Sequence, residues 1–312
     1  MDASSLPRVA VIIPTYNRRE SVLETLAALL SDDYPEKTII LVDDGSVDGT
    51  SDVCRRRFPQ VELVRGDGNL WWSGAINLGL EVARRGRFEL VAWFNDDNRV
   101  ESGTLTIMVA AARQLAGQCV GQGEGRTIVA ARTRSTLTGA DEWIGEPPRW
   151  HSDYGYWQPQ AMDRETVPLD HPPGGRGVLI PMACFEEIGG IDQRHFPHYW
   201  ADHDFHYRAM KAGYRYYLAT GAVVWNRPNH PTSDEADRFS LRWILHFLFS
   251  RRSPMNLPTL RRLLKRHLAR DEYRARWSLL LRQTAGWLAS GWMVRHPRLH
   301  RLARSARRIF RS

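Results

Sequence analysis

The feature that most constrains this chain is the regular alternation of strand-like runs with helical segments from residue 9 to residue 94. The strand-like runs cover residues 9–13, 38–42, 61–65 and 90–94. After the first run, apolar residues fall on one helical face at Val22, Leu23, Leu26, Leu29 and Leu30. Asn17 with Glu20 resembles a capping box at the start of that helix. Repeated strand–helix units of this length predict an α/β fold with a mostly parallel sheet flanked by helices.

Acidic residues gather where two of these runs end. Asp43 and Asp44 close the second run, and Asp96 and Asp97 follow the fourth. Ligands of parallel sheets lie beyond the carboxyl ends of the strands, so a site is expected there. Adjacent carboxylates repel each other, and a divalent cation such as Mn2+ or Mg2+ would compensate that repulsion. The alternative for either cluster is a solvated turn that caps the following helix.

The signals weaken after residue 117. One strand is expected at 127–132, and a further run at 177–181 precedes a helix over 183–188. Asp202 and Asp204 then open a helix that is expected to stop at Gly213. A carboxylate at that position could take a proton from an acceptor hydroxyl. Equally, it could only interact favourably with the helix dipole.

Charge divides the chain into an acidic body and a basic tail. Of the net charge of +8, residues 236–312 hold 19 Lys and Arg against three acids, so the remainder is acidic. We expect an α/β domain over residues 1–235 and a basic helical region over 236–312.

The widely spaced Cys54, Cys119 and Cys184 are typical of thiols in a reducing compartment. No signal peptide or membrane span is expected, which predicts a cytoplasmic location that includes the inner face of the cell membrane.

Five short motifs occur together in a recognisable order. They are Pro14-Thr15-Tyr16-Asn17-Arg18, Val42-Asp43-Asp44-Gly45-Ser46, the segment 69–79, Phe94-Asn95-Asp96-Asp97 and Trp200-Ala201-Asp202-His203-Asp204. Their order and spacing resemble those of family-two glycosyltransferases over roughly residues 8–230. The resemblance implies a GT-A fold and an inverting transfer of a hexosyl or deoxyhexosyl group from a nucleotide-diphosphate sugar to a hydroxyl acceptor. It also implies UDP- or dTDP-sugar donors, saccharide or lipid-linked saccharide acceptors, and a place in cell-surface polysaccharide or glycolipid assembly.

The resemblance assigns roles to single residues. Asp202 matches the catalytic base, and Asp97 matches the ligand of the divalent metal, Mn2+ or Mg2+. The donor-binding positions that it implies are Pro14, Thr15, Tyr16, Asp43, Asp44, Asn69, Trp71, Asn77 and Asp96. Trp72 could also stack on base or sugar. A core aromatic is the alternative for at least one of the two tryptophans.

Two positions depart from the family pattern. Ala201 stands where the family usually has Glu before the catalytic Asp. The position of a family metal-binding His aligns best with Asn226, and His230 is the candidate ligand, with a surface histidine as the alternative. His203 and His206 are expected to be helix-face residues.

Two other functions stay open. One is a nucleotidyltransferase, although this sequence lacks the Gly-rich phosphate loop that such enzymes usually carry. The other is a catalytically dead relative that binds membranes.

The basic tail carries apolar residues at helical spacing. They are Leu241, Trp243, Ile244, Phe247, Leu248, Leu263, Leu264, Trp277, Leu280, Leu281, Trp287, Leu288 and Trp292. Basic helices with aromatic residues suit an anionic membrane surface. The alternative is that the stripe packs on the catalytic body or on a second subunit, which would make a homodimer. We expect no nucleic-acid partner.

Overall fold

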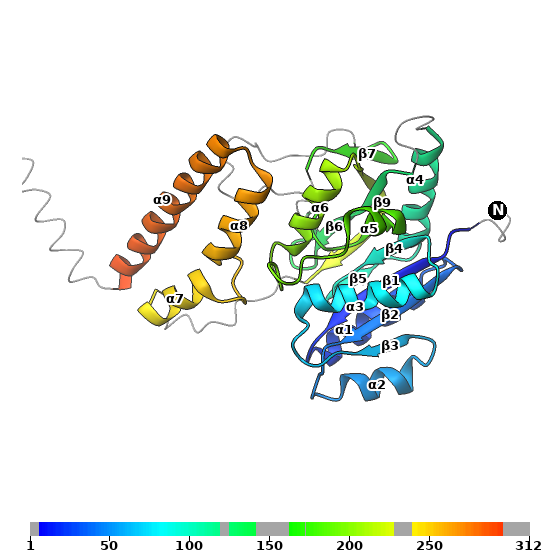
Figure 1. The fold of residues 1–312 in the computed structure, drawn as a ribbon. Coiled ribbons are helices and arrows are strands. Elements are labelled where there is room, and N and C mark those ends of the chain that lie inside the picture. Colours follow the sequence, from blue (N-terminus) through cyan, green and yellow to red (C-terminus); the bar gives the residue numbers. More distant parts are fainter. Residues whose placement is uncertain (1–5, 119–124, 142–161, 172, 228–238, 296–312) are drawn as a thin grey trace, which may run out of the picture. The chain divides into compact units, whose positions relative to one another are not determined.

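The computed structural model describes residues 6–118, 125–141, 162–171, 173–227 and 239–295 (Figure 1). It divides into two compact units. The first lies within residues 1–147 and 154–229, and the second within 148–153 and 230–312.

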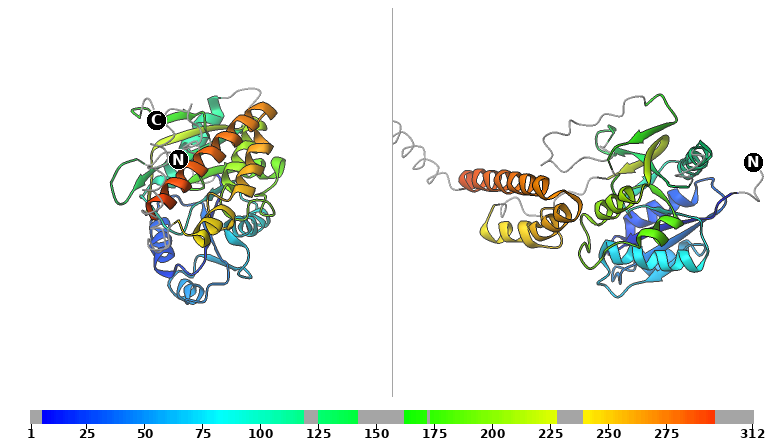
Figure 2. Two further views of the ribbon diagram at one scale, coloured as in Figure 1. Left: turned by 90° about the vertical axis from the view of Figure 1, so that its left-hand side faces the viewer. Right: turned by 45° about the horizontal axis from the view of Figure 1, so that its top comes forward.

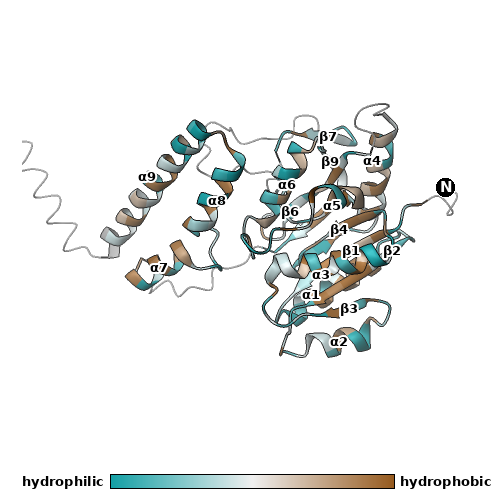
Figure 3. Cartoon of the chain, in the orientation of Figure 1, coloured by the Kyte–Doolittle hydropathy of each residue, from teal (hydrophilic) through white to brown (hydrophobic). Residues whose placement is uncertain are grey.

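The first half of the sheet of the first unit is parallel. It consists of β3 (Glu62–Arg65), β2 (Lys37–Asp43), β1 (Val9–Thr15) and β4 (Leu90–Trp93), in that order. These are the four strands that the sequence predicts. The brown colour of β1, β2 and β4 in Figure 3 reflects the apolar side chains of strands that are covered on both faces, whereas β3 at the edge of the sheet keeps Glu62 and Arg65 exposed.

The second half of the sheet is mixed. The order continues as β8 (Val178–Pro181), β6 (Thr127–Ser135), β9 (Arg215–Asn226) and β5 (Asn98–Val100), while β7 (Thr166–Leu169) also pairs with β9. Only β6 and β9 run parallel; β8 is antiparallel to both β4 and β6, and β5 and β7 are antiparallel to β9. The sequence predicts β6 and β8, and it gives no indication of the short strands β5 and β7.

Helices cover both faces of this sheet (Figure 1). They are α1 (Arg19–Leu30), α2 (Thr50–Arg57), α3 (Trp71–Arg85), α4 (Thr104–Gln118), α5 (Met182–Ile188) and α6 (Ala201–Lys211). Side chains of β1 alternate between the faces, as strand geometry requires. Val11 and Ile13 join a core that includes residues of α1, α2 and α4, while Ile12 faces Gly79 of α3. Trp93 at the end of β4 contacts α5 and α6 through Phe185 and Phe205.

The turn from β1 to α1 differs from the prediction of a capping box. The residue that precedes α1 is Arg18, whose side chain does not cap the helix; the first amide of α1, that of Arg19, donates to Asp48 Oδ2 at 3.1 Å. Asn17 instead adopts a left-handed backbone (φ 51°), and its side-chain oxygen accepts a hydrogen bond from the Val47 amide at 2.8 Å. Its own amide donates to Ser46 Oγ at 2.8 Å. Asn17 therefore ties the first motif to the second, and the capping-box prediction is wrong.

The second unit contains three helices, α7 (Leu241–Phe249), α8 (Leu257–His267) and α9 (Arg270–Arg295). Ser240 caps α7 by accepting from the Trp243 amide, and Asn256 caps α8 by accepting from the Thr259 amide. The orange and red helices α8 and α9 lie side by side (Figure 2). Within the described residues, no helix combines the length and the apolar character needed to cross a bilayer.

Gly79 offers a test of the packing between α3 and β1. A Cβ atom at this position would lie 2.5 Å from Ile12 Cγ2, and Ile12 is fully buried. We expect Gly79→Ala to lower the free energy of unfolding by about 1–2 kcal/mol, because overpacking (about 1–3 kcal/mol) outweighs the gain in helix propensity (about 1 kcal/mol). Urea denaturation measures the change.

Gly117 of α4 is the matched control. It is an exposed helical glycine with open space around its Cα. Gly117→Ala should leave stability unchanged or raise it by up to about 1 kcal/mol. Equal effects of the two substitutions would contradict the close approach of α3 to β1.

Candidate active site

Polar side chains from several loops meet where β1, β2 and β4 end. Thr15, the last residue of β1, donates from Oγ1 to Asp96 Oδ2 at 2.8 Å. Ser21 and Thr25 of α1 donate to the Asp96 carbonyl oxygen at 2.8 and 3.0 Å. Asp96 is thus fixed from β1 and α1, and it lies at the sheet edge where the sequence predicts a site.

Arg18 bridges the two carboxylates that follow β4. Its Nη1 lies 3.1 Å from Asp96 Oδ1, and its Nη2 donates to Asp97 Oδ2 at 3.2 Å. Burial raises the pKa of Asp96 to about 6; the Arg18 guanidinium opposes this shift and the Asp97 carboxylate adds to it. Arg18 therefore compensates the negative charge of Asp96 and Asp97, and the folded protein needs no further cation at this place while Arg18 is there. Without Arg18 or another cation, two buried negative charges would face each other.

The donor set of this pair suits a hard divalent cation. Asp96 and Asp97 present carboxylate oxygens, and the Arg18 guanidinium stands where positive charge is required. Among the described residues, no group of three His, Cys, Asp or Glu side chains could hold a metal ion. His230, the predicted further ligand, lies outside the described residues. One or two carboxylates suffice for Mg2+ where substrate phosphates supply the remaining ligands.

Asp43 and Asp44 accept hydrogen bonds from different segments. Asp43 is fully buried, and its oxygens accept from the Ser46 amide and the Ser51 hydroxyl, so it holds the turn after β2. Asp44 accepts from the amides of Gly68 and Trp71, both at 2.9 Å. Asp44 therefore shapes the loop that leads into α3. The predicted contact of Asp43 with a donor is not supported by this geometry, because Asp43 is enclosed by its own turn.

The two tryptophans at the start of α3 lie in different surroundings. Trp71 has a left-handed backbone (φ 57°), which is unusual for a bulky residue, and its ring contacts that of His198. Trp72 packs edge-on against the buried Trp93 and donates from Nε1 to Asn95 Oδ1 at 3.1 Å. Trp72 thus fits the alternative of an aromatic residue packed on the core. Trp71, which is half-buried, stays the candidate for stacking on a donor.

Asp202 lies in the first turn of α6 with part of its carboxylate accessible. Its Oδ1 accepts from the His203 amide at 2.9 Å and lies 3.1 Å from His203 Nδ1. Burial alone would raise the pKa of Asp202, but the His203 ring and amide, together with His206, outweigh burial and hold the pKa well below its usual range. The carboxylate is therefore ionised at neutral pH, and in this pairing with His203 it is a weaker base than a free aspartate.

The surroundings of Gly175 show where Asp202 lies relative to Asp96 and Asp97. A Cβ atom on Gly175 would lie 3.0 Å from Trp72 Cζ2 and 3.3 Å from Asp202 Oδ2. Trp72 in turn donates to Asn95, two residues before Asp97. Asp202 and the carboxylate pair therefore lie at the same end of β4, and a larger residue than glycine at 175 would crowd them.

Asp204 and His206 belong to the interior of α6. Asp204 is fully buried and accepts from Arg208 Nε at 3.0 Å. Burial lowers the pKa of His206 to about 3, so its ring is neutral, and its Nδ1 lies 3.0 Å from the Tyr216 hydroxyl. Asp204, an alternative base on the sequence alone, is thus engaged in an internal ion pair.

Asn77 also has a structural role. Its Nδ2 donates to the Ile191 carbonyl oxygen and to Gln193 Oε1, both at 2.8 Å, and its Oδ1 accepts from the Ile191 amide. The side chain clasps the segment before α6 onto α3, and both amide hydrogens are used. The predicted contact of Asn77 with the nucleotide is therefore not supported.

The remaining predicted donor residues lie on or near the rim of the site. Pro14 is buried in β1 beside Val42, while Tyr16 is half exposed. Asn69 is exposed in the loop before α3. Tyr16 and Asn69 are thus accessible to a ligand, whereas Pro14 fixes the backbone from which Tyr16 projects.

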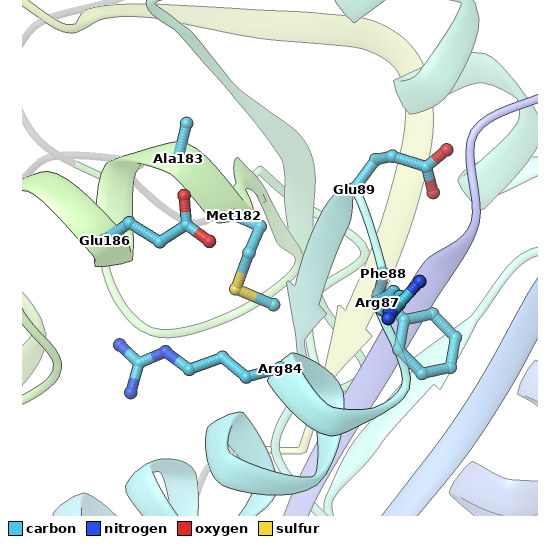
Figure 4. A pocket seen from close by; sticks show the side chains of 7 residues that line it. All are labelled: Arg84, Arg87, Phe88, Glu89, Met182, Ala183 and Glu186. Atoms are coloured by element: carbon cyan, nitrogen blue, oxygen red, sulfur yellow. The ribbon is translucent and has the colours of Figure 1, made fainter.

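A pocket near the opposite end of β4 is separate from this site (Figure 4). Arg84, Phe88, Met182 and Glu186 are among the residues that line it. Phe88 precedes β4, whereas Asp96 and Asp97 follow it. The pocket therefore lies away from the acidic cluster.

Comparison with known proteins fits the fold and the position of the acidic cluster. Residues 10–160 match the family described as glycosyl transferase family 2. This segment, about half of the chain, is a family 2 glycosyltransferase domain. This transferase is therefore an enzyme that moves sugars, and its mixed sheet is the GT-A type that the motifs imply.

Named relatives cover most of the transferase. An N-acetylglucosaminyl-diphospho-decaprenol L-rhamnosyltransferase of Mycobacterium tuberculosis is 26% identical over 243 residues, 73% of this chain and 77% of the relative. The probable glycosyltransferase YdaM of Bacillus subtilis is 25% identical and matches 71% of this chain and 51% of its own length. The crystal structure of S. aureus TarS 1-349 is similar with a TM-score of 0.54 at 16% identity, over 91% of this chain and 92% of that one. The last likeness shows the fold alone.

Some residues of the site had no role assigned from the sequence. Arg18 is part of the first motif, yet motif matching gives no reason to place its side chain between Asp96 and Asp97. Gly175 lies in a glycine-rich segment whose contact with Asp202 only the fold brings about. The available signal was the pair of adjacent carboxylates at the end of a buried strand, which needs a compensating positive charge from a side chain or a bound cation.

Two carboxylates of α6 are expected to differ in their effect on stability. Asp204→Ala should lower the free energy of unfolding by about 3 kcal/mol, because it leaves the Arg208 charge without its buried partner. Asp202→Asn should lower it less, by about 1–2 kcal/mol, since Asn still accepts from the His203 amide and loses only the partly exposed ion pair with the His203 ring. Chemical denaturation of both variants tests this, and a larger loss in the Asp202 variant would contradict the assignment of Asp204 to the interior.

Proposed function

We propose that this transferase catalyses a metal-dependent, inverting transfer from a nucleotide-diphosphate sugar to a hydroxyl of a saccharide or lipid-linked saccharide. Residues 1–235 would form the catalytic domain. The observation that carries the proposal is the convergence of Asp97 and Asp202 through Asn95, Trp72 and Gly175 at one end of β4. A displacement with inversion requires a base on the side opposite the leaving group, which two separate carboxylate positions provide.

Each residue of the site has a distinct part in the proposed reaction. A divalent cation, Mn2+ or Mg2+, held by Asp97 would neutralise charge on the leaving diphosphate. Asp202, which is ionised at neutral pH, removes the proton from the acceptor hydroxyl as that oxygen attacks the anomeric carbon. Asp44 and Tyr16 hold the nucleotide, and Asp96 lies beside the ribose. Thr15 acts through Asp96, whose carboxylate it fixes.

The relatives point to a class of donor and acceptor. The name of the mycobacterial relative describes transfer of L-rhamnose to N-acetylglucosaminyl-diphospho-decaprenol. A poly-beta-1,6-N-acetyl-D-glucosamine synthase of Staphylococcus epidermidis is 30% identical over 108 residues, 32% of this chain and 24% of the relative. For this transferase we propose a dTDP- or UDP-linked sugar as donor. The acceptor would be a lipid-linked saccharide in cell-surface polysaccharide assembly, presented at the inner face of the cell membrane.

Substitution of the two key carboxylates should separate binding from catalysis. Asp97→Ala should abolish the Mn2+-dependent part of UDP or dTDP binding, because the cation loses its protein ligand. Asp202→Asn should retain that binding and lower turnover by roughly 100-fold or more, because an amide cannot take the proton. Calorimetric titration of each nucleotide with and without Mn2+, together with donor-sugar turnover, measures both effects.

The outcomes identify which part of the proposal fails. If Asp97→Ala still binds nucleotide in a metal-dependent way, the assignment of Asp97 as the metal ligand is wrong. Full turnover in Asp202→Asn would place the base elsewhere. Asp33→Asn is the matched control, since this exposed carboxylate of the α1–β2 loop bonds only to the Thr106 hydroxyl among the interactions described and should change neither quantity.

The second unit offers a surface for the membrane that would hold such an acceptor. Leu241, Leu245 and Phe249 are 72%, 51% and 55% exposed and recur every four residues, so they form one row along α7. The other apolar residues of α7 turn inward: Trp243 and Phe247 stack on each other, and both contact Trp287 of α9. Figure 3 shows brown beside teal on α7 and α8.

Charge selects the partner of this row. Arg242 lies within α7, Arg251 and Arg252 follow it, and all three are exposed. Further exposed cations lie on α8 at Arg261, Arg262, Lys265 and Arg266. Such a surface is complementary to an anionic bilayer, because the cations can bind the headgroups while the apolar row contacts the acyl chains below them. We therefore propose an anionic bilayer as the occupant, and a second copy of the chain as the outcome that would displace it.

Vesicle binding tests this surface on the full-length protein. It should bind phosphatidylglycerol-containing vesicles at low salt, bind phosphatidylcholine vesicles weakly, and be released as salt rises. The double substitution Leu241→Glu and Leu245→Glu should weaken binding at least roughly 10-fold, from the burial of two leucine side chains that it removes.

Leu137→Glu is the matched control, because Leu137 is equally exposed but belongs to the first unit. It should leave vesicle binding unchanged. Loss of dimerisation without loss of vesicle binding in the double variant would assign the row to a subunit interface.

A further inference from the structure

Arg18 is the least buried member of the cluster formed with Asp96 and Asp97. The side chains of the two acids are 8% and 5% exposed, whereas that of Arg18 is 37% exposed. The guanidinium therefore reaches the carboxylates from the solvent side. Its contacts with the two acids, at 3.1 and 3.2 Å, are to oxygens of different carboxylates.

The carboxylates have other contacts that would keep them in place without Arg18. Asp96 still accepts from Thr15 at its second oxygen, and its carbonyl is bonded from α1. Asp97 accepts at its second oxygen from Asn98 Nδ2 at 3.3 Å. The oxygens that Arg18 contacts are the opposite ones, Asp96 Oδ1 and Asp97 Oδ2.

The backbone of Arg18 is also held independently of its side chain. Asn17, the preceding residue, is bonded to Ser46 and Val47, and the Arg18 carbonyl accepts from the Val22 amide at 3.0 Å. Rotation about side-chain bonds is therefore enough to move the guanidinium away from the carboxylates. A planar guanidinium released at this edge matches the oxygens of a diphosphate, which it can bind through two parallel hydrogen bonds.

From this arrangement we infer that Arg18 is an exchangeable counter-cation. It neutralises Asp96 and Asp97 in the donor-free enzyme, gives up their outward oxygens to the divalent cation, and then pairs with the diphosphate of the donor. The inference rests on the proposed metal-dependent function. Two cations cannot share the same carboxylate oxygens at contact distance without strong repulsion. Metal and nucleotide diphosphate therefore bind cooperatively, because the nucleotide stabilises the position that Arg18 takes when the metal enters.

Binding of Mn2+ alone and of Mn2+ with UDP or dTDP tests the exchange without any turnover. Loss of the free Mn2+ signal in electron paramagnetic resonance measures metal binding by the full-length protein. Arg18→Gln should bind Mn2+ alone at least about 5-fold more tightly than the parent, since the competing cation is gone. In the same variant, UDP or dTDP should no longer tighten Mn2+ binding to the degree seen in the parent.

Arg18→Lys and Arg19→Gln complete the comparison. An ammonium group keeps the positive charge but lacks the planar fork, so Arg18→Lys should retain competition with Mn2+ while binding the diphosphate more weakly. Arg19 contacts Glu20 and the Asp48 carbonyl instead of the carboxylate pair, so Arg19→Gln should behave as the parent. Thermal unfolding of each variant establishes that the protein is folded.

The results separate the exchange from the metal assignment. Unchanged or weaker Mn2+ binding by Arg18→Gln in the absence of nucleotide overturns the exchange, even where Asp97 still binds metal. Absence of Mn2+ binding in every variant, with and without UDP and dTDP, overturns the metal-dependent function and the exchange with it. Tighter Mn2+ binding by Arg18→Gln, with reduced coupling to the nucleotide, supports both.

Discussion

The first unit is organised around the need to compensate buried negative charge at one edge of its sheet. Asp43 and Asp44 at the end of β2 receive hydrogen bonds from amides and a hydroxyl of the neighbouring turns. Asp96 and Asp97 after β4 each receive one side-chain hydrogen bond, from Thr15 and Asn98, and share the Arg18 guanidinium. Uncompensated, such charges would cost several kcal/mol each. The loops that carry the sequence motifs are therefore the loops that supply the donors.

The kind of compensation distinguishes structural carboxylates from functional ones. Backbone amides are fixed by the fold, so a carboxylate bonded to them cannot change partners cheaply. Asp43 is of this kind, because its own turn encloses it. Asp204 is fixed in another way: its partner Arg208 is itself held by the carbonyl oxygens of Ile188 and Gly190. The Arg18 guanidinium, on a long side chain with access to solvent, can be replaced. The same reasoning leaves Asp202 available, because only one of its oxygens is engaged by His203.

The fold was predictable from the sequence wherever burial leaves a pattern. The strands β1, β2 and β4 lie between two layers of helices and have mostly continuous apolar runs as a result. By contrast, β5 and β7 are three and four residues long and exist because β9 pairs with them, which no local pattern records. The acidic cluster was predictable because parallel strands end at one edge. The sequence could not show which polar side chains have structural roles. The Asn77 amide, for example, hydrogen-bonds to residues more than a hundred positions later in the chain.

Asp44 shows how binding and structure can depend on one side chain. Both of its oxygens accept amides of the segment that leads into α3, and one of these amides belongs to Trp71, whose backbone is left-handed. A left-handed conformation in a bulky residue costs about 1–3 kcal/mol and persists only when its surroundings enforce it. Each carboxylate oxygen can still accept a second hydrogen bond, so a nucleotide base could bind Asp44 without releasing the loop. Recognition of the base at Asp44 would then be coupled directly to the position of the Trp71 ring.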